Sequence, residues 1–190
     1  SHAAAIIYDY SVLAGSQGFF HHQKLDRICE KAEEFSLPVV IFTEGGGGRP
    51  GDTDVTTQIA GLHIPSFSTW ARLTGKCLKI AVNNGYCFAG NAVLFGCSDF
   101  MIATKQSWIG MAGPAMIEGG GLGVYDPKEI GPAEEQYKNG VLDYLAEDEK
   151  EATFIAKKLL SYFQGNLSDW SIDDQTKLRD IIPEDRRWAY

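Results

Sequence analysis

Two apolar runs that each lead into glycines constrain the fold of this chain more than any other feature. Residues 37–42, Leu-Pro-Val-Val-Ile-Phe, have the pattern of a buried strand and precede four consecutive glycines at 45–48. Residues 78–82 form a second apolar run, followed by the glycine-bearing segment 84–92. Glycine leaves the backbone bare, so main-chain N–H groups can approach a ligand closely. The pattern predicts strands of an α/β fold with a ligand at their ends.

The segments around these runs alternate between helical and strand patterns. Apolar residues at Leu25, Ile28, Cys29, Ala32 and Phe35 recur at helical spacing and predict one buried helix face. Asp148 with Glu151 three residues later has the pattern of a capping box at a helix start. We expect strands at 4–12, 38–42, 78–82, 99–103, 108–111 and 141–145, and helices at 54–74, with Ile59, Leu62, Trp70 and Leu73 in the core, and at 89–96 and 173–182. This order indicates mostly parallel pairing.

Composition limits the partners of the chain. Its 190 residues fit one domain, and its net charge of −8 argues against general nucleic-acid binding, which needs a basic surface. No apolar stretch reaches the length of about 18 residues that a membrane span needs, so we expect no membrane partner. The cysteines lack the spacing of a metal site and are interpreted as reduced core residues of a cytoplasmic protein: Cys29, Cys77, Cys87 and Cys97.

The glycine loops are compatible with an oxyanion hole, in which two N–H donors converge on one oxygen. The donors nearest the strand ends are Gly46 and Gly47 in the first loop and Gly90 and Asn91 in the second. The oxygen that would profit most is that of a thioester enolate. The alternative is that these glycines only serve tight turns. A phosphate loop is excluded because Arg49, and not a lysine followed by Ser or Thr, comes after the glycines.

Several charged side chains lie near these loops. His21 and His22 precede the first predicted helix, close to Lys24, and could contact a ligand phosphate or simply face solvent. Arg49, inside the glycine loop, could bind an anion or hold the loop in place. Glu44 and Glu118 are the best-placed carboxylates for acid–base chemistry, although Glu44 could instead anchor its loop. No metal site is expected.

Taken together, the motifs resemble those of one known family over almost the whole chain. The matching segments are Tyr8–Val12, Gly15–Gly18 with His22 and Lys24, Glu44–Asp54, Cys87–Ala92, Gly113–Glu118, Asn139–Asp143 and Ile182–Glu184. In this order they resemble the carboxyltransferase component of biotin-dependent acyl-CoA carboxylases, of the acetyl- and propionyl-CoA carboxylase type, within the crotonase superfamily.

The resemblance implies an α/β, crotonase-like spiral of β-β-α turns. It implies transfer of a carboxyl group from carboxybiotin, on a separate biotin carboxyl carrier domain, to the α-carbon of an acyl-CoA. Backbone N–H groups of Gly46, Gly47, Gly90 and Asn91 would hold the thioester enolate. Substrate contacts are expected at His22, Lys24, Arg49, Ala89, Gly113 and Pro114. No metal takes part.

The chain departs from the family pattern in two ways. Asn91 stands where many members carry a second glycine, and the chain matches only the first of two crotonase-like domains. We therefore expect residues 1–165 to form the acyl-CoA-binding domain and 166–190 a C-terminal helix and linker of a larger, homo-oligomeric enzyme. Its partners would include a second carboxyltransferase domain. Two alternatives remain open: an enoyl-CoA hydratase or isomerase using Glu44 and Glu118, and a non-catalytic assembly module.

Overall fold

The computed structural model describes residues 2–49, 51, 64–166, 169–181 and 183–185. Its main sheet has five parallel strands in the order β1-β2-β3-β5-β7. They are β1 (Ala4–Ile7), β2 (Val39–Phe42), β3 (Lys79–Asn83), β5 (Phe100–Thr104) and β7 (Tyr144–Ala146). A second, two-stranded sheet pairs β4 (Tyr86–Phe88) with β6 (Trp108–Gly110), also in parallel. The strands of the main sheet are short and apolar, as expected where both faces are covered.

The chain repeats one structural turn along these sheets. It runs through β3 in the main sheet, β4 in the small sheet and then α3 (Gly90–Gly96); it repeats this with β5, β6 and α4 (Pro114–Gly119). A third pass is marked by the bridge between Gly45, after β2, and Cys87 in β4. The predicted spiral of β-β-α turns is therefore confirmed.

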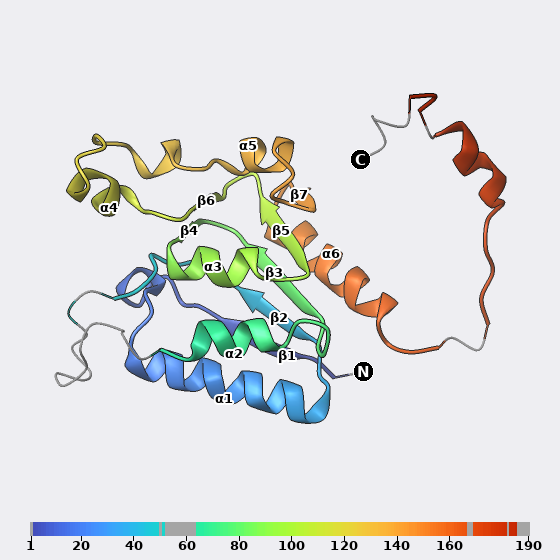
Figure 1. Ribbon diagram of the computed structural model, residues 1–190, viewed down its shortest axis with the longest axis horizontal. Coiled ribbons are helices and arrows are strands. Elements are labelled where there is room, and N and C mark those ends of the chain that lie inside the picture. Colours follow the sequence, from blue (N-terminus) through green and yellow to red (C-terminus); the bar gives the residue numbers. More distant parts are fainter. Residues whose placement is uncertain (1, 50, 52–63, 167–168, 182, 186–190) are drawn as a thin grey trace.

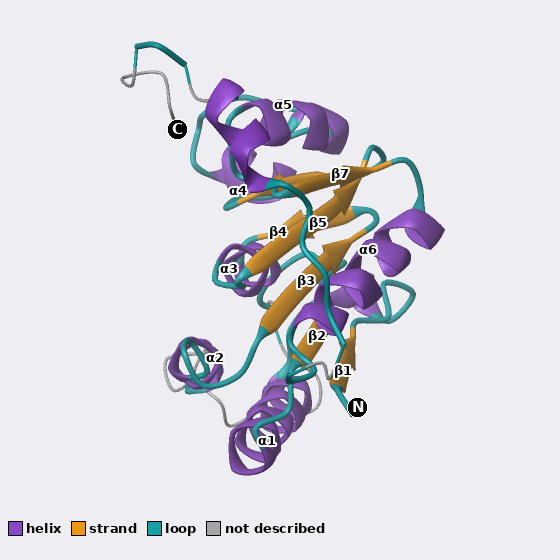
Figure 2. Ribbon diagram, turned by 90° about the vertical axis from the view of Figure 1, so that its right-hand side faces the viewer, coloured by secondary structure: helices purple, strands orange, loops and turns teal. Residues whose placement is uncertain are grey.

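Helices cover the two faces of the main sheet unequally. Helices α1 (Phe19–Phe35), α2 (Ser66–Arg72) and α3 lie on one face, and α6 (Glu149–Tyr162) lies on the other (Figures 1 and 2). The first face holds the larger core, which includes Leu25, Cys29, Trp70, Ile41 and Phe95. The predicted apolar face of α1 is correct for Leu25, Cys29 and Ala32, whereas Phe35 is 61% exposed at the last turn.

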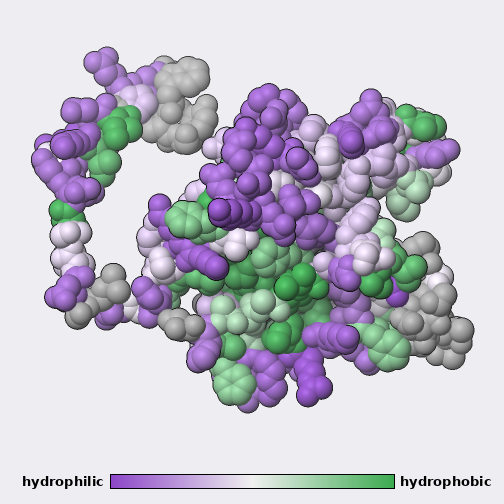
Figure 3. Space-filling view, turned by 180° about the vertical axis from the view of Figure 1, so that it is seen from behind, coloured by the Kyte–Doolittle hydropathy of each residue, from purple (hydrophilic) through white to green (hydrophobic). Residues whose placement is uncertain are grey.

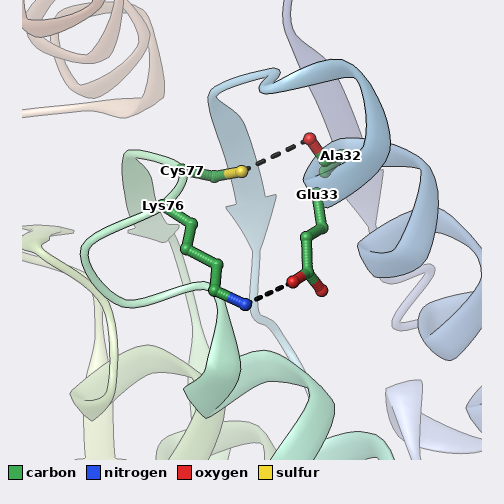
Figure 4. Close-up of polar contacts among 4 residues, drawn as sticks. All are labelled: Ala32, Glu33, Lys76 and Cys77. Atoms are coloured by element: carbon green, nitrogen blue, oxygen red, sulfur yellow. Dashed lines mark hydrogen bonds and ion pairs between the residues drawn. The ribbon is translucent and has the colours of Figure 1, made fainter.

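Side-chain hydrogen bonds and an ion pair define the start of α6 and anchor the end of α1. The Asp148 carboxylate accepts from the N–H of Glu151 at the start of α6, as predicted, but the Glu151 carboxylate accepts from Glu147 and not from Asp148. The C-terminal end of α1 is joined to the segment before β3 (Figure 4). There the Cys77 thiol donates to the Ala32 carbonyl at 3.3 Å, and Lys76 pairs with Glu33.

Several sequence predictions are corrected by the structure. The first strand ends at Ile7, because the next residues turn, with the Asp9 carboxylate accepting from Ser11. Strand β4 and the short helix α4 (Pro114–Gly119) were not predicted. Cys97 is exposed and not a core residue. The last predicted helix is a 3₁₀ helix, Gln175–Asp180.

The predicted helix at 54–74 is described only in part. Its described portion is α2, which begins after Pro65 and buries Trp70. Leu73, which follows α2, is also buried. The predicted core contacts Ile59 and Leu62 lie outside the described residues.

The face behind the sheet has an apolar area bordered by polar side chains (Figure 3). Helix α6 packs on β3, β5 and β7, and Ile7 of the edge strand β1 is 72% exposed. A hollow of about 620 Å³ next to α6 is lined by Ile7, Phe42 and Phe154 with lysines at Lys150 and Lys157. Within the described residues, every helix is too short or too polar to cross a membrane.

Candidate active site at the two glycine loops

The first glycine loop, residues 45–48, is held by hydrogen bonds from three directions. The Gly45 N–H donates to Tyr86 O at 2.7 Å, and Phe88 N–H donates back to Gly45 O at 2.8 Å. The Gly46 N–H donates to Ala14 O at 3.0 Å. The Gly47 N–H donates to the Asn91 side-chain oxygen at 2.9 Å. The loop is therefore a fixed piece of backbone, because three of its four amides already have acceptors.

Gly48 is the exception in this loop. A parallel bridge joins it to Gln17, whose N–H donates to Gly47 O at 2.7 Å and whose carbonyl accepts from Arg49 N–H at 2.9 Å. In such a bridge the N–H of the central residue points away from its partner strand. Among the described residues, nothing accepts a hydrogen bond from the Gly48 amide. A β-carbon at Gly48 would meet none of the described residues within 4 Å, so none of them covers this backbone.

The second loop turns the chain sharply from β4 into α3. Ala89 has φ 50° and ψ −119°, a conformation that is strained for a residue with a side chain, and its N–H donates to Gly110 O at 3.0 Å. The next two amides, of Gly90 and Asn91, belong to the first turn of α3 and have no intrahelical acceptor. Nothing in the described part of the chain accepts from either of them.

The two loops are in direct contact. Gly47 has φ 90°, and a β-carbon built on it would lie 2.5 Å from the Ala89 β-carbon and 3.2 Å from the Gly90 nitrogen. Gly113, which precedes α4, packs against the residue before Ala89, since a β-carbon there would be 3.4 Å from the Phe88 ring. Pro114 follows as the first residue of α4. The backbone must be bare at Gly47 for the loops to approach this closely.

The structure changes which donors a ligand could use. Four donors were predicted from the sequence, but the amides of Gly46 and Gly47 donate within the chain. The amides of Gly48 and Gly90 remain, with Asn91 beside them. Sequence reasoning missed Gly48 because the direction of an N–H depends on the ladder with Gln17, a residue distant in sequence.

A pocket of about 500 Å³ lies between β1 and α1, beside the first loop. Its polar lining includes Ser16, His21, Lys24 and Arg49, and its apolar lining includes Ile28. The Arg49 guanidinium donates to the Ser16 hydroxyl at 3.2 Å and to the Ser16 carbonyl at 3.0 Å. Arg49 thus holds its loop in place while presenting positive charge to the pocket.

The two adjacent histidines differ in environment. His22 is buried, and its Nδ1 lies 3.0 Å from the Ser66 hydroxyl of α2, so it joins two helices and is absent from the pocket lining. His21 lines the pocket, and its ring centroid is 4.3 Å from that of Tyr8. Burial, together with the nearby His22, Arg49 and Lys24, lowers the pKa of His21 to about 4. His21 is therefore neutral at pH 7.

The two candidate carboxylates are not brought together by any contact in the described residues. Glu44 Oε1 accepts from Asn84 N–H at 2.6 Å, and burial raises the pKa of this carboxyl. The negative charge of Glu149, at the start of α6, raises this pKa further. Glu118 is an exposed residue of α4. No group of three or more His, Cys, Asp or Glu side chains in the described residues could hold a metal ion.

Known proteins share both the sequence pattern and the fold. The methylmalonyl-CoA carboxyltransferase 12S subunit of Propionibacterium freudenreichii subsp. shermanii is 30% identical over 198 residues, which cover 100% of this chain and 37% of that subunit. A solved single-chain, multi-domain long-chain acyl-CoA carboxylase is 51% identical with a TM-score of 0.81, over 95% of this chain and 18% of that one.

A transcarboxylase 12S structure with hydrolysed methylmalonyl-CoA bound is 29% identical with a TM-score of 0.71, over 93% of this chain and 36% of that one. The chain thus spans less than two fifths of the length of these relatives. The family model described as carboxyl transferase domain matches residues 3–190. On this match and on the shared fold, the chain belongs to the carboxyl transferase domain family.

Proposed function

We propose that this chain is the acyl-CoA-side domain of a biotin-dependent acyl-CoA carboxyltransferase, and that Gly48 and Gly90 hold the oxygen of a thioester enolate. The observation that carries the proposal is the meeting of two glycine loops, each of which presents an amide without an acceptor in the described residues. Family membership and relatives named for acyl-CoA carboxylation support the choice of reaction.

The backbone arrangement suits a charge that develops during the reaction. Loss of an α-proton from an acyl-CoA thioester places negative charge on the thioester oxygen. Two preorganised amides aimed at that oxygen lower the energy of the enolate, and losing one such donor typically costs about 100- to 1000-fold in kcat. Carboxybiotin, on a carrier domain, supplies the carboxyl group that the α-carbon takes up. The open space over Gly48 fits a ligand that has to reach the backbone.

The neighbouring pocket fits the anionic part of the same substrate. Lys24 and Arg49 place two positive charges in its lining, and phosphate groups are bound well by such side chains. His22 would contribute by fixing α1 against α2 through Ser66, and not by touching the ligand. Ala89, Gly113 and Pro114 would frame the thioester end, because Ala89 turns the second loop into α3 and Gly113, next to Pro114, packs against Phe88.

The proposal extends to domain organisation and partners. Residues 1–165 would be the acyl-CoA-binding domain, and 166–190 a C-terminal helix and linker. A second carboxyltransferase domain and a biotin carboxyl carrier domain would complete the reaction, in a homo-oligomeric parent. Support comes from a solved relative whose structure is described as a hexamer assembly.

The decisive experiment removes one amide and uses a second substitution of the same residue, which keeps the amide, as its control. In the holoenzyme that contains this domain, Gly48→Pro deletes the N–H, whereas Gly48→Ala keeps it and adds one carbon to open space. We expect kcat for acyl-CoA carboxylation to fall about 100-fold or more in the proline variant. The alanine variant should mainly raise KM. Thermal unfolding of both variants controls for damage to the loop, and equal kcat values would refute the assignment.

The hydratase alternative has less support. It needs two carboxylates that face one substrate, but Glu44 is bound to the backbone at Asn84 and Glu118 is exposed on α4. The double variant Glu44→Gln, Glu118→Gln should therefore leave carboxylation within a few-fold of wild type. Hydration of an enoyl-CoA by the wild type, lost in the double variant, would instead favour the hydratase.

A further inference from the structure

The side chain of Asn91 joins three segments that are far apart in the sequence. It is fully buried at the start of α3, and its Oδ1 accepts from Gly47 N–H at 2.9 Å. Its Nδ2 donates to Thr43 O at 3.2 Å and lies 3.5 Å from Gly15 O. The turn before α1, the first glycine loop and the second loop therefore meet at one carboxamide.

The chemistry of these partners requires an amide in one orientation. Gly47 offers a donor, so it needs an acceptor, and the two carbonyls need a donor. Gly45 is bare at this contact, since a β-carbon there would lie 2.2 Å from Asn91 Nδ2 and 2.4 Å from Gly15 O. The absence of a side chain at Gly45 thus makes room for the Asn91 side chain.

Contacts on both sides of Gly47, one from Asn91 and one from Gln17, fix the direction of the open amide at Gly48. Asn91 holds the N–H of Gly47, and Gln17 N–H holds the C=O of Gly47 at 2.7 Å. Both peptide groups of Gly47 are therefore oriented by bonds from outside the loop. Because the C=O and N–H of a trans peptide point in opposite directions, the Gly48 N–H is directed away from Gln17.

We propose that Asn91 is a positioning residue, which aims the Gly48 amide at the reacting oxygen by holding Gly47 from the opposite loop. This rests on the proposed function of the two loops. The side chain does not touch the substrate; it acts through Gly47. Its effect should therefore fall on kcat, since a displaced donor loses transition-state stabilisation.

The test compares two isosteric substitutions of buried asparagines in the holoenzyme. Asn91→Leu removes the bonds to Gly47 and Thr43 while keeping the volume. Asn83→Leu is the matched control, because Asn83 is also fully buried and bonds to Gly85 and Thr43 but not to Gly47. We expect Asn91→Leu to lower kcat about 10- to 100-fold at nearly constant KM, by analogy with small misplacements of catalytic groups. Asn83→Leu should lower kcat less than threefold.

A conservative variant supplies a signature that a purely structural role would not give. In Asn91→Asp, one oxygen can still accept from Gly47, but the ionised carboxylate repels the Thr43 carbonyl. The protonated acid restores a donor to Thr43. The kcat of Asn91→Asp relative to wild type should therefore recover as the pH falls from 8 to 6. A ratio that is flat or declines with falling pH would contradict the proposal.

Hydrogen exchange keeps this inference separate from the proposed function. In Asn91→Leu, the peptide covering residues 43–49 should exchange faster than in wild type and in Asn83→Leu. Unchanged exchange there would overturn the anchoring of Gly47 whatever the activity. Faster exchange with wild-type kcat would overturn the positioning role. Failure of the wild-type holoenzyme to carboxylate any acyl-CoA would overturn the proposed function alone.

Discussion

The chain contains two glycine runs, 45–48 and 119–121, which look alike in the sequence and differ in the structure. In the first run, β-carbons at Gly45 and Gly47 would collide with Asn91, Gly15 and Ala89. In the second run, a β-carbon at Gly119 or Gly121 would meet none of the described residues within 4 Å. Gly45 and Gly47 are bare because the side chains of Asn91 and Ala89 and the Gly15 carbonyl occupy the space of their β-carbons. The second run ends the short helix α4, and its tightest contact among the described residues is at Gly120, where a β-carbon would lie 3.2 Å from the Met116 carbonyl oxygen.

The difference shows that glycine occurs in the two runs for different reasons: close approach of neighbouring atoms in the first, and a helix end in the second. A glycine is needed for close approach only where a neighbour occupies the space of its β-carbon, and composition alone does not reveal this. The resemblance had implied substrate contacts at Gly113 and Pro114, just before the second run. The structure supports contact with the second loop at Gly113, next to Phe88. The substitutions below test whether the two runs differ in energy as they do in packing.

The largest effect is expected at Gly47. Gly47→Ala combines a strained φ of 90° with a contact of 2.5 Å to the Ala89 β-carbon. We expect a loss of about 3 kcal/mol or more in the free energy of unfolding, from strain and overpacking together. Urea unfolding of the variant measures it. If Gly47→Ala lost less unfolding free energy than a substitution in the second run, the two runs would not differ in the way proposed.

The next largest loss of unfolding free energy is expected at Gly90, in the second loop next to Gly47. A β-carbon there would be 2.3 Å from Gln17 Oε1, and Gln17 is buried. Gly90→Ala should cost about 2 kcal/mol of unfolding free energy. Because the colliding atom ends a side chain, Gln17→Ala in the same protein should recover about 1 kcal/mol relative to the sum of the single variants. A double-mutant cycle gives this coupling, and a value near zero would mean that Gln17 moves aside at no cost.

The stability of the protein should also depend on pH, because His21 lines the pocket beside the first run. The folded-state pKa of His21, about 4, lies below its unfolded value near 6.5, so the native state binds fewer protons. The contribution of neutral His21 to the free energy of unfolding is therefore complete above pH 6.5, and it is lost as the pH falls towards 4. Between pH 7 and pH 5, after allowance for partial exposure, wild type should lose about 1 kcal/mol more than His21→Gln. Identical pH profiles for the two proteins would contradict the lowered pKa.

The smallest effect, with the opposite sign, is expected in the second run. Gly119 is in α4, and no described residue would crowd a β-carbon there, so Gly119→Ala should stabilise the fold by about 0.5 kcal/mol, through helix propensity and a less flexible unfolded chain. Thermal unfolding would show a small rise in Tm and unchanged carboxylation. Destabilisation by more than 1 kcal/mol would mean that this run, too, is packed.

Much of the fold could be predicted from the sequence because its signals are local. The apolar runs of β2 and β3 and the helical spacing in α1 needed only neighbouring residues, and Asp148 correctly marked the start of α6. Strand β4 was missed because three residues between two loops carry no periodicity.

The site was predictable in place but not in its detail. The two glycine loops were expected to lie together, and they do. Which amides remain open depends on Gln17 and Asn91, whose contacts with the first loop come from distant segments. Likewise, only the packing of α1 against α2 separates His22, which is bonded to Ser66, from His21, which lines the pocket.

The parallel sheet also governs how such a chain reaches its native state. Ala4 pairs with Val39, Val39 with Lys79, and Ile102 with Tyr144, so each of these pairings closes a long loop of chain. Topologies dominated by contacts of this kind have high contact order and fold slowly, because loop-closure entropy is lost before the pairings stabilise the product. The bridges at Gly45 and Gly48 form between equally distant segments. Refolding should therefore restore the two loops late, together with the sheet.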